Sequence, residues 1–326
     1  MFYYAPTDPA CRAAVRDDER VSERALAAGP VLVAVDAGAT KSVAVAVLSD
    51  GRWAGRAEGG GANPKRHGLG AATATIVSLA RDAAEDARPS LILVAGAGID
   101  RPEHAMALES SLRAALPGAD VIVVNDTLAA LRAGTPDAVG LAVPASTGGN
   151  VIGRAADGRV TDRGHGIFGG SYVLGALAAR AARRGKGGPG TVGPALAAAV
   201  DAAALEWRGR RPSPNAASLG PAVAAAAEAG YSLPARLVDR WCRRVAVAVC
   251  EEAGRLALGP APAVVLYGGM LDASPWLEAR LRAAIREGAP GARIARLALE
   301  PVDGAVLLAL DAWAGRPIFW QFVPRR

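Results

Sequence analysis

The sequence predicts an α/β protein built from two copies of a similar unit, and three observations lead to this prediction. Short runs of Val, Ala and Leu that suit buried strands alternate with longer segments of helical spacing. Each copy opens with two strand-like runs around a small-residue turn, followed by an Asp-Gly hairpin signal at 50–51 and again at 157–158. The chain has 326 residues, which is enough for two domains with separate cores.

The first half of the chain is typical of an antiparallel opening that continues into parallel strands. Gly, Pro and Asp residues separate its elements, as expected where regular structure ends. A glycine-rich loop at 59–70 joins the opening to the first helix. The expected strands are 31–36, 42–49, 52–59, 91–99 and 121–126, and the expected helices are 70–87, 103–116 and 127–134.

The second half repeats this order and adds Ala-rich helices. Residues 138–164 have the pattern of strand, turn, strand, hairpin and strand. Helices are expected at 171–184, 192–208, 220–230 and 234–258. After them we expect a strand, a Gly-Gly turn and a helix over 263–285, then a strand at 293–300 and a closing helix at 303–315. We therefore expect an N-terminal extension at 1–30 and domains at 31–138 and 139–326, and the closing helix could pack back on the first domain.

Composition excludes several classes of protein. With 51% hydrophobic and 21% charged residues, the chain is globular rather than disordered. No apolar run reaches the roughly 18 residues that a membrane helix needs, and acidic residues at 17–19 stand where a signal peptide has its apolar centre. The three cysteines are scattered and odd in number, so no disulfide framework is expected. These features predict a cytoplasmic protein with no membrane partner.

The net charge of +6 comes almost wholly from arginine. Arginine clusters such as 183–184, 208–211 and 243–244 could contact nucleic acid, but neither aromatic interleaving nor helix-turn-helix spacing accompanies them. We interpret the excess as a solvated surface and expect no nucleic-acid partner.

Polar residues interrupt the buried run VLVAVDAGATKSVAVAV at residues 31–47. Gly38 lacks the Cβ that would keep an anion from the backbone N–H groups, while Thr40 and Lys41 offer a hydroxyl donor and a cation. Asp36 alone would repel phosphate, so it fits best where Mg²⁺ and its waters stand between the two. The second copy carries Thr147, Gly148 and Gly149 at the corresponding turn. The two turns together predict a pair of phosphate-binding loops.

Asp126 ends the strand-like run VVND just before a helical segment. The carboxyl end of a buried strand is where α/β proteins bind ligands. Asp126 could accept the proton of a substrate hydroxyl as its oxygen attacks a γ-phosphate. The alternative is that Asp126 only caps the helix that begins at Thr127, which aspartate does well.

Six short stretches, in this order, resemble a known family. They are DAGATKS, GANP, VAGAGIDRPEH, VVNDTLAAL, STGGN and VVLYGGM. Over residues 31–315 the chain is similar to the N-acetylglucosamine kinase and BadF/BcrA-type ATPase family. That family shares its ATPase fold with acetate and sugar kinases, heat-shock chaperones and actin. The resemblance implies two ribonuclease-H-like (actin-like ATPase) domains that flank a nucleotide cleft and close on binding.

The resemblance also implies a carbohydrate kinase that uses ATP and Mg²⁺, with roles for particular residues. Asp126 would be the general base acting on the acceptor hydroxyl, and Asp36 would hold Mg²⁺ through water. ATP would be bound by Asp36, Gly38, Thr40, Lys41, Thr147, Gly148, Gly149, Gly268 and Gly269. The acceptor would be bound by Asn63, Gly96, Asn125, Asp126, Asn150 and His165.

One segment departs from the family pattern. Family members usually carry GWG…GDEGS after the second phosphate turn, whereas this chain reads RGHGIFGGS, with Ser146 replacing a glycine in the turn itself. His165 could contact the substrate or act as a structural donor in a glycine-rich loop. Because this segment helps to frame the sugar, the acceptor is left open between an N-acetylglucosamine-like amino sugar and a related sugar or cyclitol.

Two alternatives belong to other functional classes. A nucleotide-binding member without catalytic activity would fit the missing Asp-Glu pair of the departing segment. An ATP-driven activator of a reductase or dehydratase would need an iron–sulfur cluster, and Cys242 and Cys250 are eight positions apart in one predicted helix. The family resemblance also leaves a homodimer open.

Overall fold

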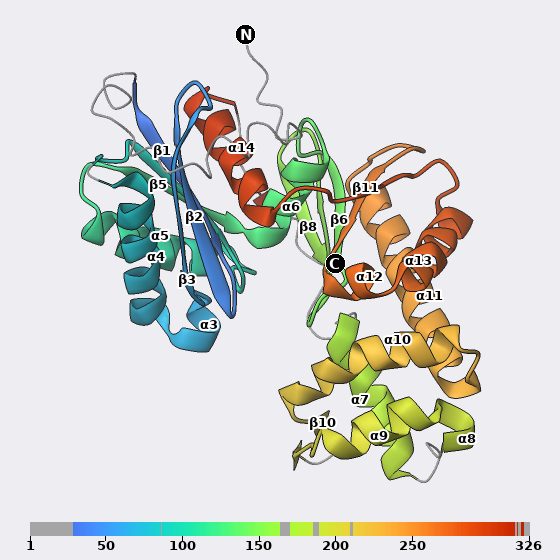
Figure 1. The fold of residues 1–326 in the computed structure, drawn as a ribbon. Helices are drawn as coiled ribbons and strands as arrows, with labels where there is room; N and C mark the ends of the chain where they lie inside the picture. The colour runs from blue at the N-terminus through green and yellow to red at the C-terminus, as the bar shows by residue number, and fades with distance from the viewer. Residues whose placement is uncertain are drawn as a thin grey trace. The chain divides into compact units, whose positions relative to one another are not determined.

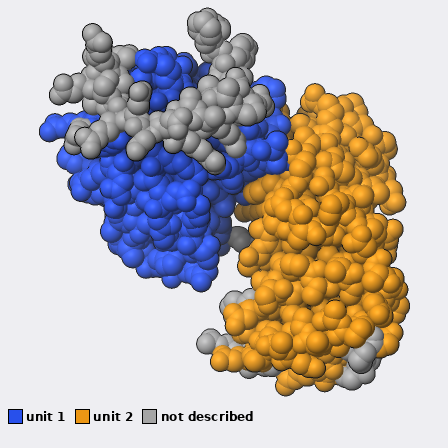
Figure 2. All heavy atoms as spheres, in the orientation of Figure 1, with its two compact units in different colours: residues 1–138, 156–158, 297–322 blue, residues 139–155, 159–296, 323–326 orange. Residues whose placement is uncertain are grey.

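The computed structural model describes residues 29–85, 87–163, 170–184, 189–208, 211–316, 318 and 321–322. The chain divides into two compact units, which are coloured separately in Figure 2 and described one at a time. Unit 1 comprises Met1–Ala138, Ala156–Gly158 and Leu297–Phe322, and unit 2 comprises Val139–Ala155, Arg159–Arg296 and Val323–Arg326. The predicted extension at 1–28 and the predicted site residue His165 lie outside the described residues.

Unit 1 is built on a five-stranded sheet of order β3-β2-β1-β4-β5 (Figure 1). Its strands are β1 (Val31–Ala37), β2 (Lys41–Leu48), β3 (Trp53–Gly60), β4 (Leu91–Gly96) and β5 (Asp120–Asn125). The first three strands pair antiparallel, and β1, β4 and β5 run parallel. Asp36 lies opposite Ala95 in this register, and Gly96 lies opposite Asn125. The carboxyl ends of the parallel strands therefore meet at one edge of the sheet.

Helices cover both faces of this sheet. The helices of unit 1 are α3 (Pro64–His67), α4 (Leu69–Ala84), α5 (Pro102–Ala115), α6 (Asp126–Gly134) and α14 (Pro301–Trp313). Val33 and Val35 of β1 share a buried core with Ile76 of α4 and Leu108 of α5. The other face carries α6 and α14, which pack on each other and on the sheet (Figure 1). Because β1 is covered on both faces, it is hydrophobic without alternation.

The closing helix α14 belongs to unit 1 although it comes from the end of the chain. A Cβ on Gly304 would lie 1.9 Å from the backbone oxygen of Ala129, so the backbones of α14 and α6 approach at a point where only glycine fits. Arg132 Nε donates to Asp311 Oδ2 at 2.6 Å, and both side chains are 12% exposed. These contacts fix α14 to α6.

Unit 2 repeats the strand order of unit 1. Its parallel and antiparallel strands follow the order β12-β11-β6-β7-β8, which corresponds to β5-β4-β1-β2-β3. The bounds are β6 (Gly140–Pro144), β7 (Val151–Arg154), β8 (Arg159–Arg163), β11 (Ala263–Tyr267) and β12 (Arg293–Arg296). The predicted hairpin is closed by a bond from Ala155 N to Arg159 O at 2.9 Å. The equal topology of the two sheets confirms the repeat that the sequence predicted.

Helices form the rest of unit 2. They are α7 (Gly170–Arg183), α8 (Pro189–Val192), α9 (Pro194–Ala202), the 3₁₀ helix η1 (Pro214–Leu219), α10 (Gly220–Glu228), α11 (Ser232–Arg255), α12 (Gly269–Ala273) and α13 (Pro275–Gly288). Two-residue strands β9 (Trp207–Arg208) and β10 (Arg211–Pro212) pair with each other. A further two-residue strand, β13 (Gln321–Phe322), belongs to unit 1. In the described part of the chain, no helix is long and apolar enough to cross a membrane.

Three local expectations were too coarse. The helix expected at 192–208 is α9, which ends at Ala202, and Trp207 and Arg208 form the strand β9 instead. The glycine-rich loop at 59–70 contains the short helix α3, because the Asn63 side chain accepts hydrogen bonds from Lys65 N and Arg66 N at its start. The last strand was expected at 293–300 but ends at Arg296. The four residues after it lead to α14, and Leu297 begins the return to unit 1.

Candidate active site

The turn between β1 and β2 is tightly built. A Cβ on Gly38 would lie 2.3 Å from the backbone oxygen of Lys41, so the turn itself requires this glycine. The backbone oxygen of Gly38 accepts a hydrogen bond from Ala62 N at 2.9 Å, and His67 Nε2 lies 2.9 Å from the oxygen of Ala39. The loop after β3 therefore supports the turn from behind. Thr40 at its tip is exposed.

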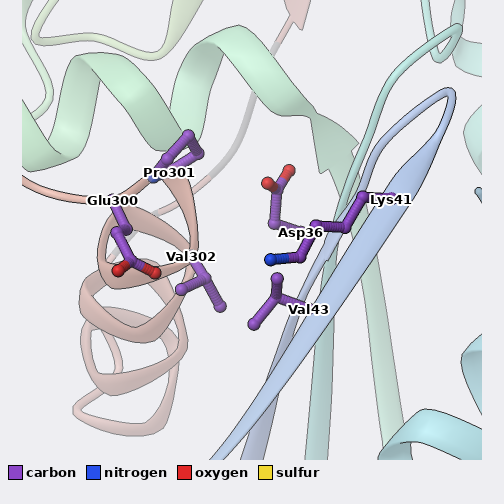
Figure 3. Close-up of a pocket in the computed structure, with 6 residues that line it drawn as sticks. All are labelled: Asp36, Lys41, Val43, Glu300, Pro301 and Val302. Atoms are coloured by element: carbon purple, nitrogen blue, oxygen red, sulfur yellow. The ribbon is translucent and has the colours of Figure 1, made fainter. Parts of the chain in front are cut away.

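A pocket of about 200 Å³ lies between this hairpin and the start of α14 (Figure 3). Asp36, Lys41 and Val43 line it from the hairpin, and Glu300, Pro301 and Val302 line it from the other side. Lys41 Nζ lies 2.6 Å from Glu58 Oε2 on β3. Both of those side chains are exposed, so the pair is weak and Lys41 can exchange partners readily.

Asp36 is half-buried in an unusual electrostatic environment. Burial raises its pKa to about 7, and the carboxylates of Asp126 and Glu300 add to the shift. Among the described residues, the Asp36 carboxylate has no hydrogen-bond donor or cationic partner. Three carboxyl groups therefore lie in one region of unit 1, and one of them, Glu300, is paired with Arg56.

Asp126 occupies the first position of α6, while its neighbour caps the helix. Asn125 is 2% exposed; its Oδ1 accepts from Thr127 N at 2.9 Å, and its Nδ2 donates to Ile99 O at 3.0 Å. The sequence had left open whether Asp126 only caps the helix, and the structure assigns the N-cap position to Asn125. Asp126 Oδ1 also accepts from Thr127 N at 2.9 Å. Burial raises the pKa of Asp126, and the nearby Asp100 adds to the shift.

Asn63 and Gly96, which were predicted to bind the acceptor, lie near Asp126 in unit 1. Asn63 uses its Oδ1 to start α3, so its amide NH₂ is the group left for a ligand. A Cβ on Gly96 would lie 2.7 Å from Ile99 Cγ1, so packing against Ile99 explains why a glycine occupies this position. Lys65 forms an ion pair with Asp100, whose charge acts on Asp126. Sequence analysis missed Lys65 and Asp100, and only their closeness to Asp126 reveals them.

The turn between β6 and β7 is the counterpart of the first turn in unit 2. The backbone oxygens of Ser146 and Thr147 accept hydrogen bonds from the first turn of α7 at 2.9 and 3.1 Å. A Cβ on Gly148 would meet no atom within 4 Å, so the outer side of the turn is open there. Next to Gly149, Asn150 donates from Nδ2 to Asp162 Oδ1 at 3.3 Å. Sequence analysis missed Asp162, which holds the predicted ligand Asn150.

The Gly-Gly turn after β11 lies beside the end of β6. Gly268 has φ +112°, and a Cβ there would lie 2.6 Å from the backbone oxygen of Ala145. Met270 N donates to the same oxygen at 3.1 Å. A Cβ on Gly269 would meet no atom within 4 Å. Gly268 is thus required by the backbone, and Gly269 leaves the surface of the turn open.

Two carboxylates line the pocket of unit 1, Asp36 and Glu300, and they suit a magnesium ion that keeps most of its water. Carboxylate oxygens are ligands that Mg²⁺ prefers, and it is usually held by one or two carboxylates together with substrate phosphates. No group of three or more His, Cys, Asp or Glu residues in the described ranges could enclose a metal by itself. Asp36 and Glu300 fit the more open arrangement, in which the nucleotide supplies the remaining ligands.

Solved structures share this fold. A candidate N-acetylglucosamine kinase from Chromobacterium violaceum is 22% identical with a TM-score of 0.64, over 86% of this chain and 99% of that chain. A candidate N-acetylglucosamine kinase from Porphyromonas gingivalis is 21% identical with a TM-score of 0.62, over 86% and 99%. A ROK family glucokinase from Streptomyces griseus, in complex with glucose and AMPPNP, is 16% identical with a TM-score of 0.54, over 86% and 98%.

These likenesses confirm the predicted fold class of two ribonuclease-H-like (actin-like ATPase) domains. No curated protein matches the sequence at a significant level. The model of one family, the BadF/BadG/BcrA/BcrD ATPase family, matches residues 33–309. The match covers most of the chain, including both turns that were predicted to bind phosphate, Asp126 and the start of α14. The chain therefore belongs to the BadF/BadG/BcrA/BcrD ATPase family.

Proposed function

We propose that the protein is an ATP-dependent carbohydrate kinase that phosphorylates a hydroxyl of an amino sugar or of a related sugar or cyclitol. The observation that carries this proposal is the position of Asp126. It follows the parallel strand β5, and Asn125 serves as N-cap of α6 in its place. Family membership supports the use of ATP, and the solved sugar kinases support the choice of acceptor class.

In the proposed reaction the acceptor hydroxyl oxygen attacks the γ-phosphorus of ATP. The new oxygen–phosphorus bond forms as the bond from γ-phosphorus to the bridging oxygen breaks, and ADP leaves with that electron pair. Asp126 takes the hydroxyl proton. A raised carboxyl pKa favours this step, because a stronger base holds the proton better at neutral pH. Magnesium would neutralise charge that develops on the phosphate oxygens.

The other proposed ligands have separate tasks. Lys41, Thr40 and the turns at Gly38 and Gly148 would contact the triphosphate, with Asp36 toward the metal. Thr147, Gly149, Gly268 and Gly269 would complete the nucleotide contacts in unit 2. On the acceptor side, the amide of Asn63 would bind sugar hydroxyls. Asn125 is occupied by internal bonds, so we propose that it positions Asp126 rather than the sugar.

The test is ADP release from Mg-ATP with a panel of acceptors: N-acetylglucosamine, glucosamine, N-acetylmuramate, glucose and aminocyclitols. One acceptor should raise the rate, and Asp126→Asn should lower kcat by about 10²–10⁴-fold, the usual range for a lost general base. Asn63→Ala serves as a control, because losing a binding contact should raise KM more than it lowers kcat. Wild-type rates in Asp126→Asn would refute the proposed role.

The described cysteines favour the kinase over the activator of a reductase or dehydratase. Cys242 is 3% exposed, and burial raises the pKa of its thiol to about 12. Cys250 is half-buried, and its Sγ would lie 2.7 Å from a Cβ placed on Gly288. Cluster ligands are thiolates, which a thiol in an apolar core does not readily become. The nucleotide-binding alternative would show ATP binding without turnover on the whole panel.

A further inference from the structure

Glu300 and Asp36 line opposite sides of the pocket of unit 1, although the two residues lie near opposite ends of the chain (Figure 3). Both residues belong to the lining of one pocket of about 200 Å³. The sequence pattern gave no functional reason for Glu300, which precedes a predicted helix and has no polar neighbours of the phosphate-turn type.

The position of Glu300 is fixed by packing. It is the N-cap residue of α14, and its backbone N–H donates to Asp303 Oδ2 at 2.9 Å. Helix α14 is in turn locked to α6 at Gly304, where no Cβ could be accommodated. Asp126 is the first residue of α6. One rigid helix pair therefore holds Glu300 and Asp126 in unit 1, together with the hairpin that carries Asp36.

Glu300 also ends a chain of ion pairs on the rim of the pocket. Arg56 donates to Glu300 Oε2 at 2.9 Å and to Glu58 Oε1 at 2.7 Å, and Glu58 pairs with Lys41 at 2.6 Å. The four charges of this chain cancel. Asp36 and Asp126 lie outside this chain of ion pairs; when ionised, their carboxylates add negative charge that it does not balance, and Asp36 has no cationic partner among the described residues. A divalent cation would balance them.

We infer that Glu300 is the second carboxylate that this protein offers to the divalent cation of the nucleotide, opposite Asp36. The inference rests on the proposed use of Mg-ATP. Arg56 leaves Glu300 with lone pairs on two oxygens, so the carboxylate can serve Arg56 and the cation at once. When the nucleotide binds, Lys41 exchanges its ion pair with Glu58 for the triphosphate. Arg56 then neutralises Glu58.

The test is the effect of Mg²⁺ on ATP affinity, measured by isothermal titration calorimetry of the full chain with and without the metal. Glu300→Gln keeps the shape and an acceptor oxygen for the helix start but removes the charge. The matched control is Glu58→Gln, because Glu58 also binds Arg56 but does not line the pocket. Metal-free thermal unfolding shows whether each variant is folded, and Glu300→Asp tests whether a shorter carboxylate restores the metal effect.

In the wild type, Mg²⁺ should tighten ATP binding, and Glu300→Gln should reduce this gain at least about tenfold. Metal-free ATP affinity should stay equal or improve, since one negative charge is gone. Glu58→Gln should keep the gain, and Glu300→Asp should recover part of it. An unchanged gain in Glu300→Gln, or an equal loss in Glu58→Gln, overturns the role of Glu300 while the kinase proposal stands. A wild type that binds no Mg-ATP overturns both.

Discussion

Replacing Asp36 by asparagine should stabilise the protein at alkaline pH while it abolishes the Mg²⁺-dependent gain in ATP affinity. An isolated aspartate has a pKa of 3.8, and in the folded chain burial, Asp126 and Glu300 raise the pKa of Asp36 to about 7. A raised pKa means that the folded state holds a proton which the unfolded state releases between these two values. Stability is therefore lost as pH rises from about 4 to about 7, and the full cost remains above pH 7.

The size of the effect follows from the same comparison. At 1.36 kcal/mol for each pKa unit, the cost of ionising Asp36 at high pH is at most roughly 4 kcal/mol. Water and neighbouring side chains relax around a half-buried group. We therefore expect the stability advantage of Asp36→Asn over wild type to grow by about 1–3 kcal/mol between pH 5 and pH 8.5. Asparagine has nearly the same shape and carries no charge, so packing is kept.

The assay is urea unfolding of both proteins at the two pH values, in EDTA and without nucleotide. Taking the difference between variant and wild type cancels the titration of every group that does not interact with Asp36. Asp82→Asn is the control, because Asp82 is an exposed carboxylate on α4, outside the pocket. A difference that stays constant with pH, or a variant that is less stable at both values, would show that the pKa of Asp36 is not raised in the folded protein.

Two further predictions concern the cores of the two units. Gly304→Ala should lower the free energy of unfolding by about 2–4 kcal/mol, because its methyl would lie 1.9 Å from Ala129 O. The control Gly254→Ala, on the open side of α11, should be neutral or should stabilise by up to about 1 kcal/mol. Urea unfolding measures both. Cys242 should resist iodoacetamide at pH 8 in the native protein, since burial raises its thiol pKa to about 12, while Cys250 reacts first. Peptide mapping by mass spectrometry reads out each thiol, and rapid labelling of Cys242 in folded protein would contradict its burial.

Local chemistry explains why much of unit 1 could be predicted. The run from Val31 to Leu48 carries its own signals, with buried strands on both sides of a turn, and it folds as β1 and β2. The place of Asp126 follows from a general rule about the carboxyl ends of parallel strands. In both cases the residues that decide the structure are neighbours in the sequence or belong to adjacent strands.

The position of Glu300 beside the pocket could not be predicted from such local signals. Its closeness to Asp36 depends on α14 returning to unit 1, and that return depends on Gly304 and Asp311 meeting partners on α6. Nothing in the spacing of residues 300–313 identifies those partners. Gly38 is a second example. It was predicted to let an anion approach the backbone, but the conformation of the turn requires a glycine there whether or not an anion binds.

Contacts outside the pocket hold the carboxyl groups of Asp36, Asp126 and Glu300 in the same region of unit 1. The charges of Asp126 and Glu300 disfavour the ionised form of Asp36, and this repulsion opposes the approach of α14 to the hairpin. The opposing contacts include the Arg56–Glu300 ion pair between β3 and the start of α14. The Gly304–Ala129 approach and the Arg132–Asp311 pair add to them on the shared face of α6 and α14. A bound cation would relieve the repulsion without moving either helix. The electrostatic cost is thus present in the ligand-free protein, and ligand binding recovers it, which favours tight binding of a metal–nucleotide complex over free nucleotide.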